Sequence, residues 1–216
     1  MFIKFKKLIP AFIVIGFFAA LALSGCATPK AAKTGFLKNY SNLEPHPEID
    51  GRHRYINPHI DAAKYSKFIV EPVAVNLSAK GKERGIDPKE LSRLATFFRQ
   101  KITEELQKGY KIVQSAGPDV ARVRASISDV DKTLPYLNVH PGTKMMGGGL
   151  GGAGAEMELV DSMTGQSIAA GIDNQKGSRL SIGAGLTWYG HAEEVMGNWA
   201  KDLKKWVDQT HGKFSE

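Results

Sequence analysis

The side chain best placed for covalent chemistry is Cys26, the only cysteine in the chain. It follows Leu23-Ser24-Gly25, at the end of an N-terminal segment with three lysines and then an apolar stretch, residues 8–22. This order is typical of a secretory signal peptide, and the apolar stretch is shorter than the roughly 20 residues that span a bilayer. A thiol at this position is a nucleophile that can be covalently modified. The alternatives are that the segment is a plain membrane-spanning helix or that Cys26 is a buried structural cysteine. A single thiol allows no disulfide within the chain.

The four residues that end in Cys26 resemble the lipobox of bacterial lipoproteins. This resemblance implies that the thiol receives a diacylglyceryl group, that the chain is cut before Cys26 and that the new amine is acylated. Two lipid signals give stable anchoring, because each buried methylene contributes about 0.8 kcal/mol. We therefore expect residues 1–25 to be a removed signal peptide and Cys26 to hold the protein at a membrane. The resemblance also implies that Ala27, in place of Asp, favours the periplasmic face of the outer membrane over the inner membrane.

The charge of the chain argues against a nucleic-acid partner. The whole chain has 29 basic and 22 acidic residues. Removal of residues 1–25 takes three lysines and no acidic residue, which leaves 26 basic against 22 acidic residues, a net charge of +4. Nucleic-acid binding needs a clustered basic face, so we expect no such partner. Roughly 150 residues beyond the N-terminal segments suffice for one domain with its own core.

Other residue types that could do chemistry do not form a recognisable site. Gly149, Gly151 and Gly154 match the pattern G-x-G-x-x-G, but a dinucleotide site needs a helix after it and a strand pattern follows here, so we interpret the segment as a flexible loop. No nucleophile elbow supports a hydrolase. No histidines show a tight metal-ligand spacing; the six are His46, His53, His59, His140, His191 and His211. We expect no enzyme activity, no metal and no cofactor.

Acidic and basic side chains alternate with apolar ones in two predicted strands. Arg122 and Arg124 share one face of residues 121–128, while Glu156 and Glu158 share one face of the next strand. We interpret these as solvent-facing residues that pair across the strands, each pair contributing roughly 0.2–1 kcal/mol. The phase slips at residues 129–131, which predicts a bulge or the end of the strand.

The periodicity predicts an α/β fold, a mixed sheet with a late antiparallel meander and two main helices packed against it. One helix begins at Asp87-Pro88 and ends near Gly109, and the other covers residues 189–209. Residues 68–75 read as a strand covered on both faces, which Pro72 places at an edge or near its end. Shorter strands are predicted at residues 110–113, 156–161 and 168–172, with a hairpin turn at Thr164-Gly165, and residues 80–85 as a charged loop.

We divide the mature chain into three parts. Residues 26–33 form a tether, residues 34–65 an extended arm laid over the domain, and residues 66–211 a single α/β periplasmic domain. The arm is rich in Pro, His and Asn and lacks a clear period. Its expected anchors on the domain are the apolar and aromatic residues Phe36, Leu37, Tyr40, Leu43, Tyr55 and Ile56.

A series of short motifs resembles a family of uncharacterised bacterial lipoproteins. The motifs are Thr34-Gly35-Phe36-Leu37 with Tyr40 and Leu43, Arg54-Tyr55, Val70-Glu71-Pro72-Val73, and Asp161-Ser162-Met163-Thr164-Gly165. More loosely, the order of elements looks like small periplasmic domains such as the N-terminal domain of TolB, the lipoprotein activators of penicillin-binding proteins and the auxiliary lipoproteins of ABC transporters. The resemblance implies protein binding without catalysis and supplies no catalytic residues.

Two glycine-rich apolar segments are the candidate contact surface. Residues 134–153 join the first two meander strands, and residues 180–189 follow the third, so both should lie at one end of the sheet. Exposed apolar surface of this kind marks a contact with a partner, ligand or membrane. Equally, the segments could pack on each other and cover the core. The predicted partner-binding residues are Tyr136, Leu137, Met145, Met146, Leu150, Leu186 and Trp188.

The leading hypothesis is a lipid-anchored, non-enzymatic binding or assembly module of the bacterial cell envelope, with an envelope protein as its partner. The alternative is a small-molecule carrier or an enzyme acting on an envelope component, with the glycine-rich loops as a lid. A pocket beneath the loops would favour that alternative. A third hypothesis is a self-assembling structural lipoprotein.

Overall fold

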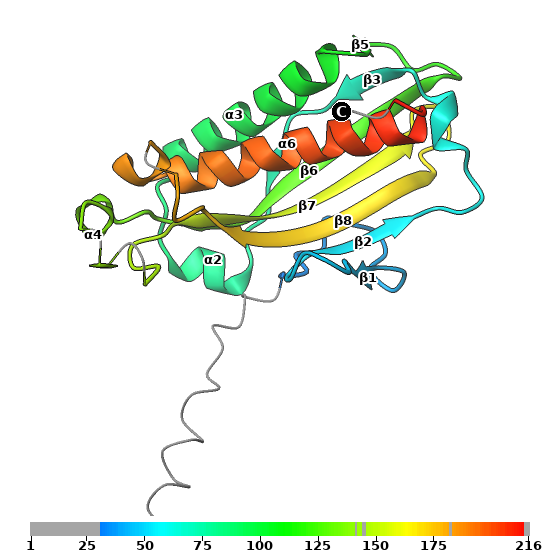
Figure 1. Cartoon of the computed structure of the whole chain (residues 1–216). Coiled ribbons are helices and arrows are strands. Elements are labelled where there is room, and N and C mark those ends of the chain that lie inside the picture. Colours follow the sequence, from blue (N-terminus) through cyan, green and yellow to red (C-terminus); the bar gives the residue numbers. More distant parts are fainter. Residues whose placement is uncertain (1–30, 141, 144–145, 182, 214–216) are drawn as a thin grey trace, which may run out of the picture.

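The computed structural model describes residues 31–140, 142–143, 146–181 and 183–213. Cys26 and Met145 lie outside these residues. The described chain folds into one mixed sheet with the strand order β1-β2-β8-β7-β6-β3-β5, and β4 pairs with β6 next to β3. Two long helices lie side by side over one face (Figure 1). This architecture confirms the predicted α/β fold class. No helix of the described residues is long and apolar enough to cross a bilayer.

The centre of the sheet is the antiparallel meander of β6 (Val120–Asp131), β7 (Gly152–Asp161) and β8 (Ser167–Lys176). The register between β6 and β7 shifts between Ile127 and Asp129, so the predicted bulge is confirmed. The hairpin between β7 and β8 turns at Gly165, whose φ of 72° favours glycine. β7 begins earlier than predicted, because the glycines at its start already pair with both neighbouring strands.

The helices α3 (Pro88–Gln107) and α6 (Gly190–Thr210) confirm the two predicted helices. Asp87 caps α3 by accepting the backbone N–H of Lys89 at 2.8 Å. Each helix buries one apolar stripe against the sheet and against the other helix, and the rings of Phe98 and Trp199 lie 5.8 Å apart between them. The core therefore lies between the helices and the sheet.

The predicted strand at residues 68–75 is two strands, β3 (Lys67–Val70) and β4 (Ala74–Val75), both parallel to β6. The break includes Pro72, which has no N–H to donate to a ladder. β5 (Lys111–Ile112) pairs with the other side of β3. The prediction of a loop at residues 80–85 is wrong for its first part: α2 (Ala79–Glu83) forms there, because Ser78 caps it by accepting the N–H of Gly81.

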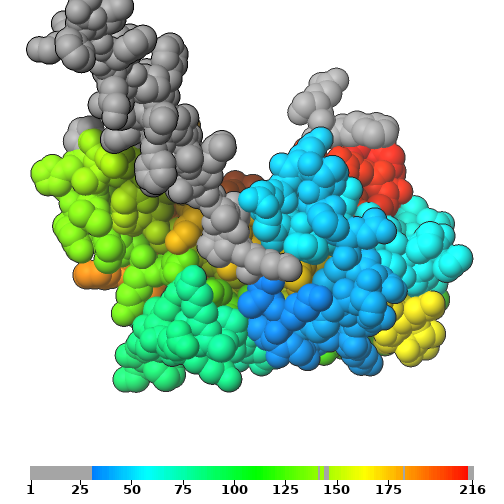
Figure 2. All heavy atoms as spheres, turned by 90° about the horizontal axis from the view of Figure 1, so that it is seen from below, coloured from blue at the N-terminus to red at the C-terminus, as the bar shows by residue number. Residues whose placement is uncertain are grey.

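The face of the sheet opposite the helices is covered by the N-terminal arm and by α2, which lie next to each other in Figure 2. The arm also extends the sheet: β2 (His53–Ile56) pairs with β8, and β1 (Glu44–Pro45) pairs with β2. A 3-10 turn, η2 (Ala62–Lys64), leads into β3. Leu37 is 3% exposed, as expected of an anchor, whereas Ile56 is 45% exposed and does not anchor the arm.

This cover corrects the prediction of a solvated strand face. Glu156 is 0% exposed and Glu158 is 7% exposed, because the arm lies over them. The predicted ion pair between Arg124 and Glu158 is confirmed. Arg122 does not pair with Glu156, since the register places Arg122 opposite Val160; it binds Glu71 at 3.1 Å instead.

Candidate functional site

Exposed apolar side chains gather at one end of the sheet, where residues 132–151 and 177–189 lie together; we call this the twin-loop end. The first segment contains α4 (Pro135–Asn138) and the second η3 (Ala184–Leu186), and these two short helices contact each other (Figure 1). Nine large apolar residues of the described chain are well exposed, and six of them belong to this end: Tyr136, Val139, Met146, Leu180, Leu186 and Trp188. The juxtaposition predicted from the topology of the meander is confirmed.

The predicted contact residues divide by exposure. Tyr136, Leu186 and Trp188 are between 55% and 60% exposed, and Met146 is 85% exposed. Leu137 and Leu150 are half-buried, so they support the surface more than they form it. The prediction missed Val139 and Leu180, which are 62% and 90% exposed. Both are apolar residues within or beside the two glycine-rich segments, and this was the signal that could have found them.

Hydrogen bonds connect the two segments and also bridge residues within the first one. The N–H of Thr133 donates to the carbonyl oxygen of Trp188 at 2.8 Å, and the N–H of Leu134 donates to the carbonyl oxygen of Gly149 at 2.9 Å. The side-chain amide of Asn138 donates to the same Gly149 oxygen, also at 2.9 Å. Among the described residues, these bonds hold the backbone of the twin-loop end while its apolar side chains stay exposed.

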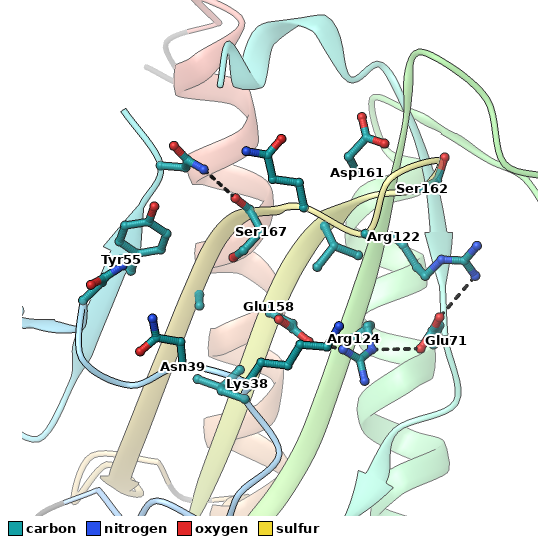
Figure 3. A pocket seen from close by; sticks show the side chains of 17 residues that line it. Lys38, Asn39, Tyr55, Glu71, Arg122, Arg124, Glu158, Asp161, Ser162 and Ser167 are labelled. Atoms are coloured by element: carbon teal, nitrogen blue, oxygen red, sulfur yellow. Dashed lines mark hydrogen bonds and ion pairs between the residues drawn. The ribbon is translucent and has the colours of Figure 1, made fainter. Parts of the chain in front are cut away.

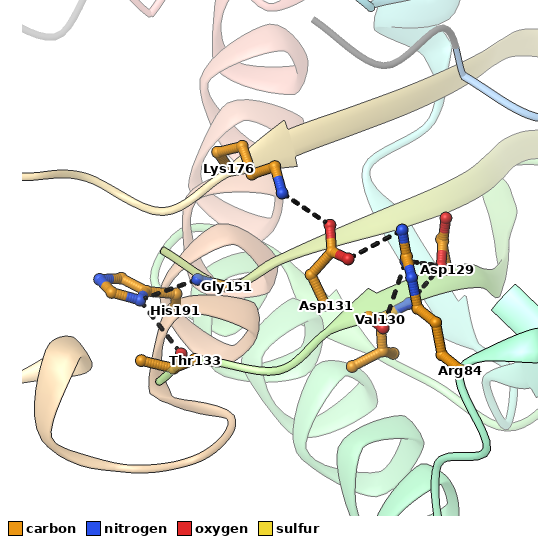
Figure 4. Close-up of polar contacts among 8 residues, drawn as sticks. All are labelled: Arg84, Asp129, Val130, Asp131, Thr133, Gly151, Lys176 and His191. Carbon is orange, nitrogen blue, oxygen red and sulfur yellow. Dashed lines mark hydrogen bonds and ion pairs between the residues drawn. The ribbon is translucent and has the colours of Figure 1, made fainter. Parts of the chain in front are cut away.

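A buried histidine lies beneath the twin-loop end (Figure 4). His191, at the start of α6, is 0% exposed, and its Nδ1 accepts the N–H of Gly151 at 3.2 Å. The hydroxyl of Thr133 lies 3.1 Å from the same nitrogen. His191 therefore ties the end of β6, the start of β7 and the start of α6 together. This is a structural role, and the His191 ring packs closely against Gly177 beneath the loops.

The glycines of this end are required by close packing. A Cβ on Gly149, where φ is +75°, would lie 2.8 Å from the carbonyl oxygen of Leu134. A Cβ on Gly151 would lie 2.6 Å from the Thr133 hydroxyl, and one on Gly177 would lie 2.3 Å from the ring of His191. The G-x-G-x-x-G match is not a loop throughout, because Gly154 lies in β7, and its glycines stand where backbones approach closely.

Ion pairs link the end of α2, β6 and β8 next to the twin-loop end (Figure 4). Arg84, just after α2, pairs with Asp129 and, at 2.8 Å, with Asp131; Lys176 at the end of β8 pairs with Asp131 at 3.0 Å. Burial raises the pKa of Asp129 above its usual range, against the opposing effect of Arg84. These contacts fix α2 to the end of β6, and the end of β6 to the end of β8.

A second feature is a pocket of about 420 Å³ on the covered face of the sheet, which we call the arm-face pocket (Figure 3). Its floor carries linked ion pairs: Arg124 lies 3.4 Å from Glu71 and also contacts Glu158. Burial raises the pKa of Glu158, and Arg124 opposes that shift. Tyr55 of β2 lies across the pocket from these charges. The lining extends to the β7–β8 hairpin, so the pocket lies away from the twin-loop end.

The N-terminal arm is held by one buried carboxylate. Both oxygens of Glu156 accept hydrogen bonds, from the N–H groups of Thr34 and Leu37 and from the hydroxyl of Tyr40. Burial and this hydrogen bond raise the pKa of Tyr40, so its hydroxyl keeps the proton that it donates. Gly35 takes a φ of +86° between the two N–H donors. The Thr34-Gly35-Phe36-Leu37 motif is thus a carboxylate-binding turn.

A family model described as "Protein of unknown function (DUF3313)" matches residues 32–203. The chain belongs to the DUF3313 family. The match starts two residues before the Glu156-binding motif and ends within α6, so it includes the arm, the sheet and the twin-loop end. The predicted resemblance to an uncharacterised family is confirmed at this level. No functionally curated protein matches the DUF3313 chain.

Several solved structures are distantly similar to this DUF3313 chain. The PelC dodecamer from Paraburkholderia phytofirmans has a TM-score of 0.41 and 10% identity, covering 69% of this chain and 96% of that one. Protein XCC0632 from Xanthomonas campestris, of the family DUF330, has a TM-score of 0.39 and 13% identity, covering 73% and 92%. A chain from Caulobacter crescentus described as a "putative lipoprotein" has a TM-score of 0.35 and 8% identity, covering 71% and 95%. These likenesses carry no functional argument, and the looser similarity to TolB stays a prediction.

Within the described residues of the DUF3313 chain, no group of three or more His, Cys, Asp or Glu side chains could hold a metal ion. The arrangement that remains is an ordered apolar surface at one end and a polar pocket on one face. The first is suited to contact with another apolar surface, and the second to a small polar molecule.

Proposed function

We propose that this DUF3313 protein is a lipid-anchored, non-enzymatic binding module of the bacterial cell envelope that holds an envelope protein at its twin-loop end. The observation that carries the proposal is the concentration of exposed apolar side chains there. Leu180 and Met146 are 90% and 85% exposed. Full burial of such a side chain is worth about 1.5–3 kcal/mol, so several of them supply a substantial part of a binding free energy.

The order of this surface supports protein binding over simple core cover. Hydrogen bonds between the two segments and within the first one hold the backbone while the apolar side chains face outward. A pre-formed surface loses little conformational entropy on association. Patches of this kind on soluble domains mark interaction sites.

The anchor and the location are supported by the sequence. Cys26 ends a lipobox-like string after an apolar leader, and Ala27 follows it. The finer proposal is therefore an acylated Cys26 in the outer membrane, with the domain in the periplasm.

Photocrosslinking in intact cells tests the proposal. A photoreactive amino acid replaces Leu186 or Trp188 at the twin-loop end, and Met163, which is 64% exposed in the β7–β8 hairpin, is the matched control. We expect a discrete heterologous product from the first two positions and none from Met163. A charged substitution, Leu186→Glu, should abolish the product obtained at Trp188 without changing the amount of protein.

Equal products from both ends, or no product at all, would contradict binding at the twin-loop end. A product with the mass of two copies of this chain would instead favour the self-assembling lipoprotein.

The small-molecule carrier remains a second candidate because of the arm-face pocket. Its charged floor and polar rim are able to bind a small polar ligand. The pocket lies toward the β7–β8 hairpin, whereas His191 and close-packed glycines fill the space under the glycine-rich loops. The loops are therefore not the lid of this pocket. A small molecule retained in the native mass spectrum would favour this candidate.

A further inference from the structure

The described chain is attached to the sheet from its first residue. Ala31 is 7% exposed and packs in a small apolar cluster with Leu37 and with Ile172 of β8. Three residues later, the N–H of Thr34 binds Glu156. The chain from Ala31 onward therefore has a fixed place on the face opposite the helices.

This fixed place limits where a lipid on Cys26 can be. Five residue steps separate Cys26 from Ala31. A fully extended chain spans at most about 3.6 Å per residue, so the two Cα atoms are at most roughly 18 Å apart. The surface around Ala31 must lie close to whichever bilayer holds the lipid.

The face of the molecule formed by α3 and α6 cannot lie flat on that bilayer. The sheet and the layer of α3 and α6 lie between Ala31 and that outer surface (Figure 1). A helix with its side chains is alone about 10–12 Å thick. The connecting chain would have to pass around the edge of the sheet and both layers, which is farther than its covalent length allows.

The segments next to Ala31, residues 31–43 and α2, are basic, whereas the acidic residues of the arm come later in the chain. Lys33 and Lys38 of the arm and Lys80 and Lys82 of α2 are all exposed, and the arm and α2 adjoin on this face (Figure 2). Residues 31–43 contain no acidic side chain, and Glu83 is the acidic residue of α2. Residues 31–43 and α2 thus contain four lysines and one glutamate. Their net positive charge is a large part of the net charge of +4 that remains after residues 1–25 are removed.

We infer that Lys33, Lys38, Lys80 and Lys82, the arm-face lysines, rest on the anionic phospholipid headgroups of the bilayer that holds Cys26. Basic residues close to a membrane each strengthen its binding, and this attraction falls off within a Debye length of about 10 Å at 0.1 M salt. The inference rests on the lipid anchor of the proposed function. The sheet then lies along the membrane, and the twin-loop end points sideways, toward proteins at the membrane surface.

Fluorescence quenching on vesicles tests this orientation. The full lipidated protein is reconstituted into vesicles of phosphatidylethanolamine and phosphatidylglycerol that carry a headgroup nitroxide quencher. Because Cys26 is the only native cysteine and is blocked by lipid, an introduced cysteine is the single site for a fluorophore. Asn42→Cys reports on the arm face, Ser92→Cys on the exposed side of α3, and Leu180→Cys on the twin-loop end; all three residues are exposed.

We expect severalfold stronger quenching at Asn42 than at Ser92, with Leu180 between them. Replacement of the four arm-face lysines by glutamate should remove most of this difference while the anchored protein still floats with the vesicles. On vesicles of phosphatidylcholine alone, the protein that keeps its four arm-face lysines should likewise lose most of the difference in quenching between Asn42 and Ser92.

Equal quenching at Asn42 and Ser92, or the strongest quenching at Leu180, would overturn the inference and leave the anchor intact. A protein that does not float with the vesicles would overturn the anchor, and the inference with it. The photocrosslinking experiment in cells tests partner binding at the twin-loop end independently of this orientation.

Discussion

Glu156 lies fully buried on β7, where its carboxylate accepts hydrogen bonds from an arm segment about 120 residues earlier in the chain. A buried carboxylate is costly unless donors surround it, and here two backbone N–H groups and one hydroxyl do so. This single residue therefore fixes the part of the chain that would lead to the proposed lipid anchor.

Glu156→Gln should loosen the arm, because an amide nitrogen would face donors where a carboxylate oxygen now accepts. We expect the free energy of unfolding to fall by roughly 1–3 kcal/mol. Hydrogen exchange should quicken across residues 31–43. Glu83→Gln, at the exposed end of α2, is the control and should stay within about 0.5 kcal/mol of the parent. Unchanged exchange in the arm of the Glu156 variant would contradict this role.

Asp161 makes the stability of the β7–β8 hairpin depend on pH. Its carboxylate accepts the hydroxyl of Tyr65 at 2.7 Å and the N–H groups of Met163 and Thr164 at 2.9 and 2.8 Å. The hydrogen bond from Tyr65, followed by those of the turn, holds the pKa of Asp161 below its usual range. A lowered folded-state pKa means that the ionised form stabilises the fold, fully so above the unfolded-state value of about 3.9.

Asp161→Asn should therefore lower the free energy of unfolding at neutral pH by roughly 1–3 kcal/mol. The difference from the parent should shrink as the pH falls below about 4, because the carboxylate of the unfolded parent chain then takes up a proton while the folded one stays ionised until a lower pH. Chemical denaturation of the parent and the variant, from neutral pH to below about pH 4, measures this difference in the free energy of unfolding. A difference that stays constant down to strongly acidic pH would show that the charge of Asp161 is not involved.

At the scale of elements, the two segments of the twin-loop end pack closely against neighbouring parts of the fold. Gly177→Ala should destabilise the protein, because the new Cβ would lie 2.3 Å from the His191 ring and overpacking of this kind costs about 1–3 kcal/mol. Gly183→Ala is the matched control in the same segment, since its φ is −63° and a Cβ there meets nothing within 4 Å. Thermal unfolding compares the two, and equal melting temperatures would refute the packing role of Gly177.

The elements also show what the sequence could predict. The apolar stripes predicted α3 and α6, and the alternation in β6 predicted which side chains share a face. Alternation cannot tell what covers the second face, and for this reason Glu156 was interpreted as solvated although the arm buries it. Likewise, glycine content does not distinguish a loose loop from backbones in close contact, which depends on residues as distant as His191 and Gly151.

At the candidate site, chain topology predicted more than composition did. The alternation of connections in a meander alone predicts that residues 134–153 and 180–189 lie at one end of the sheet. Which apolar residues of these segments face outward depends on the turns of α4 and η3 and on the hydrogen bonds that join the two segments. Leu137 and Leu150 are therefore half-buried while Leu180 is exposed.

As a whole, the molecule has three distinct surfaces: helices on one face, a basic arm face near the start of the described chain, and an apolar end. A short connection to Cys26 would bring the arm face to a bilayer and leave the apolar end free for a partner. The account thus depends on a lipid at Cys26 more than on any other chemical feature.

The intact mass of the protein extracted from the membranes of its own cells measures that feature directly. The account predicts a chain that begins at Cys26 and carries the added mass of a diacylglyceryl group and an acyl group. A chain that still begins at Met1, or one with an unmodified Cys26, would contradict it.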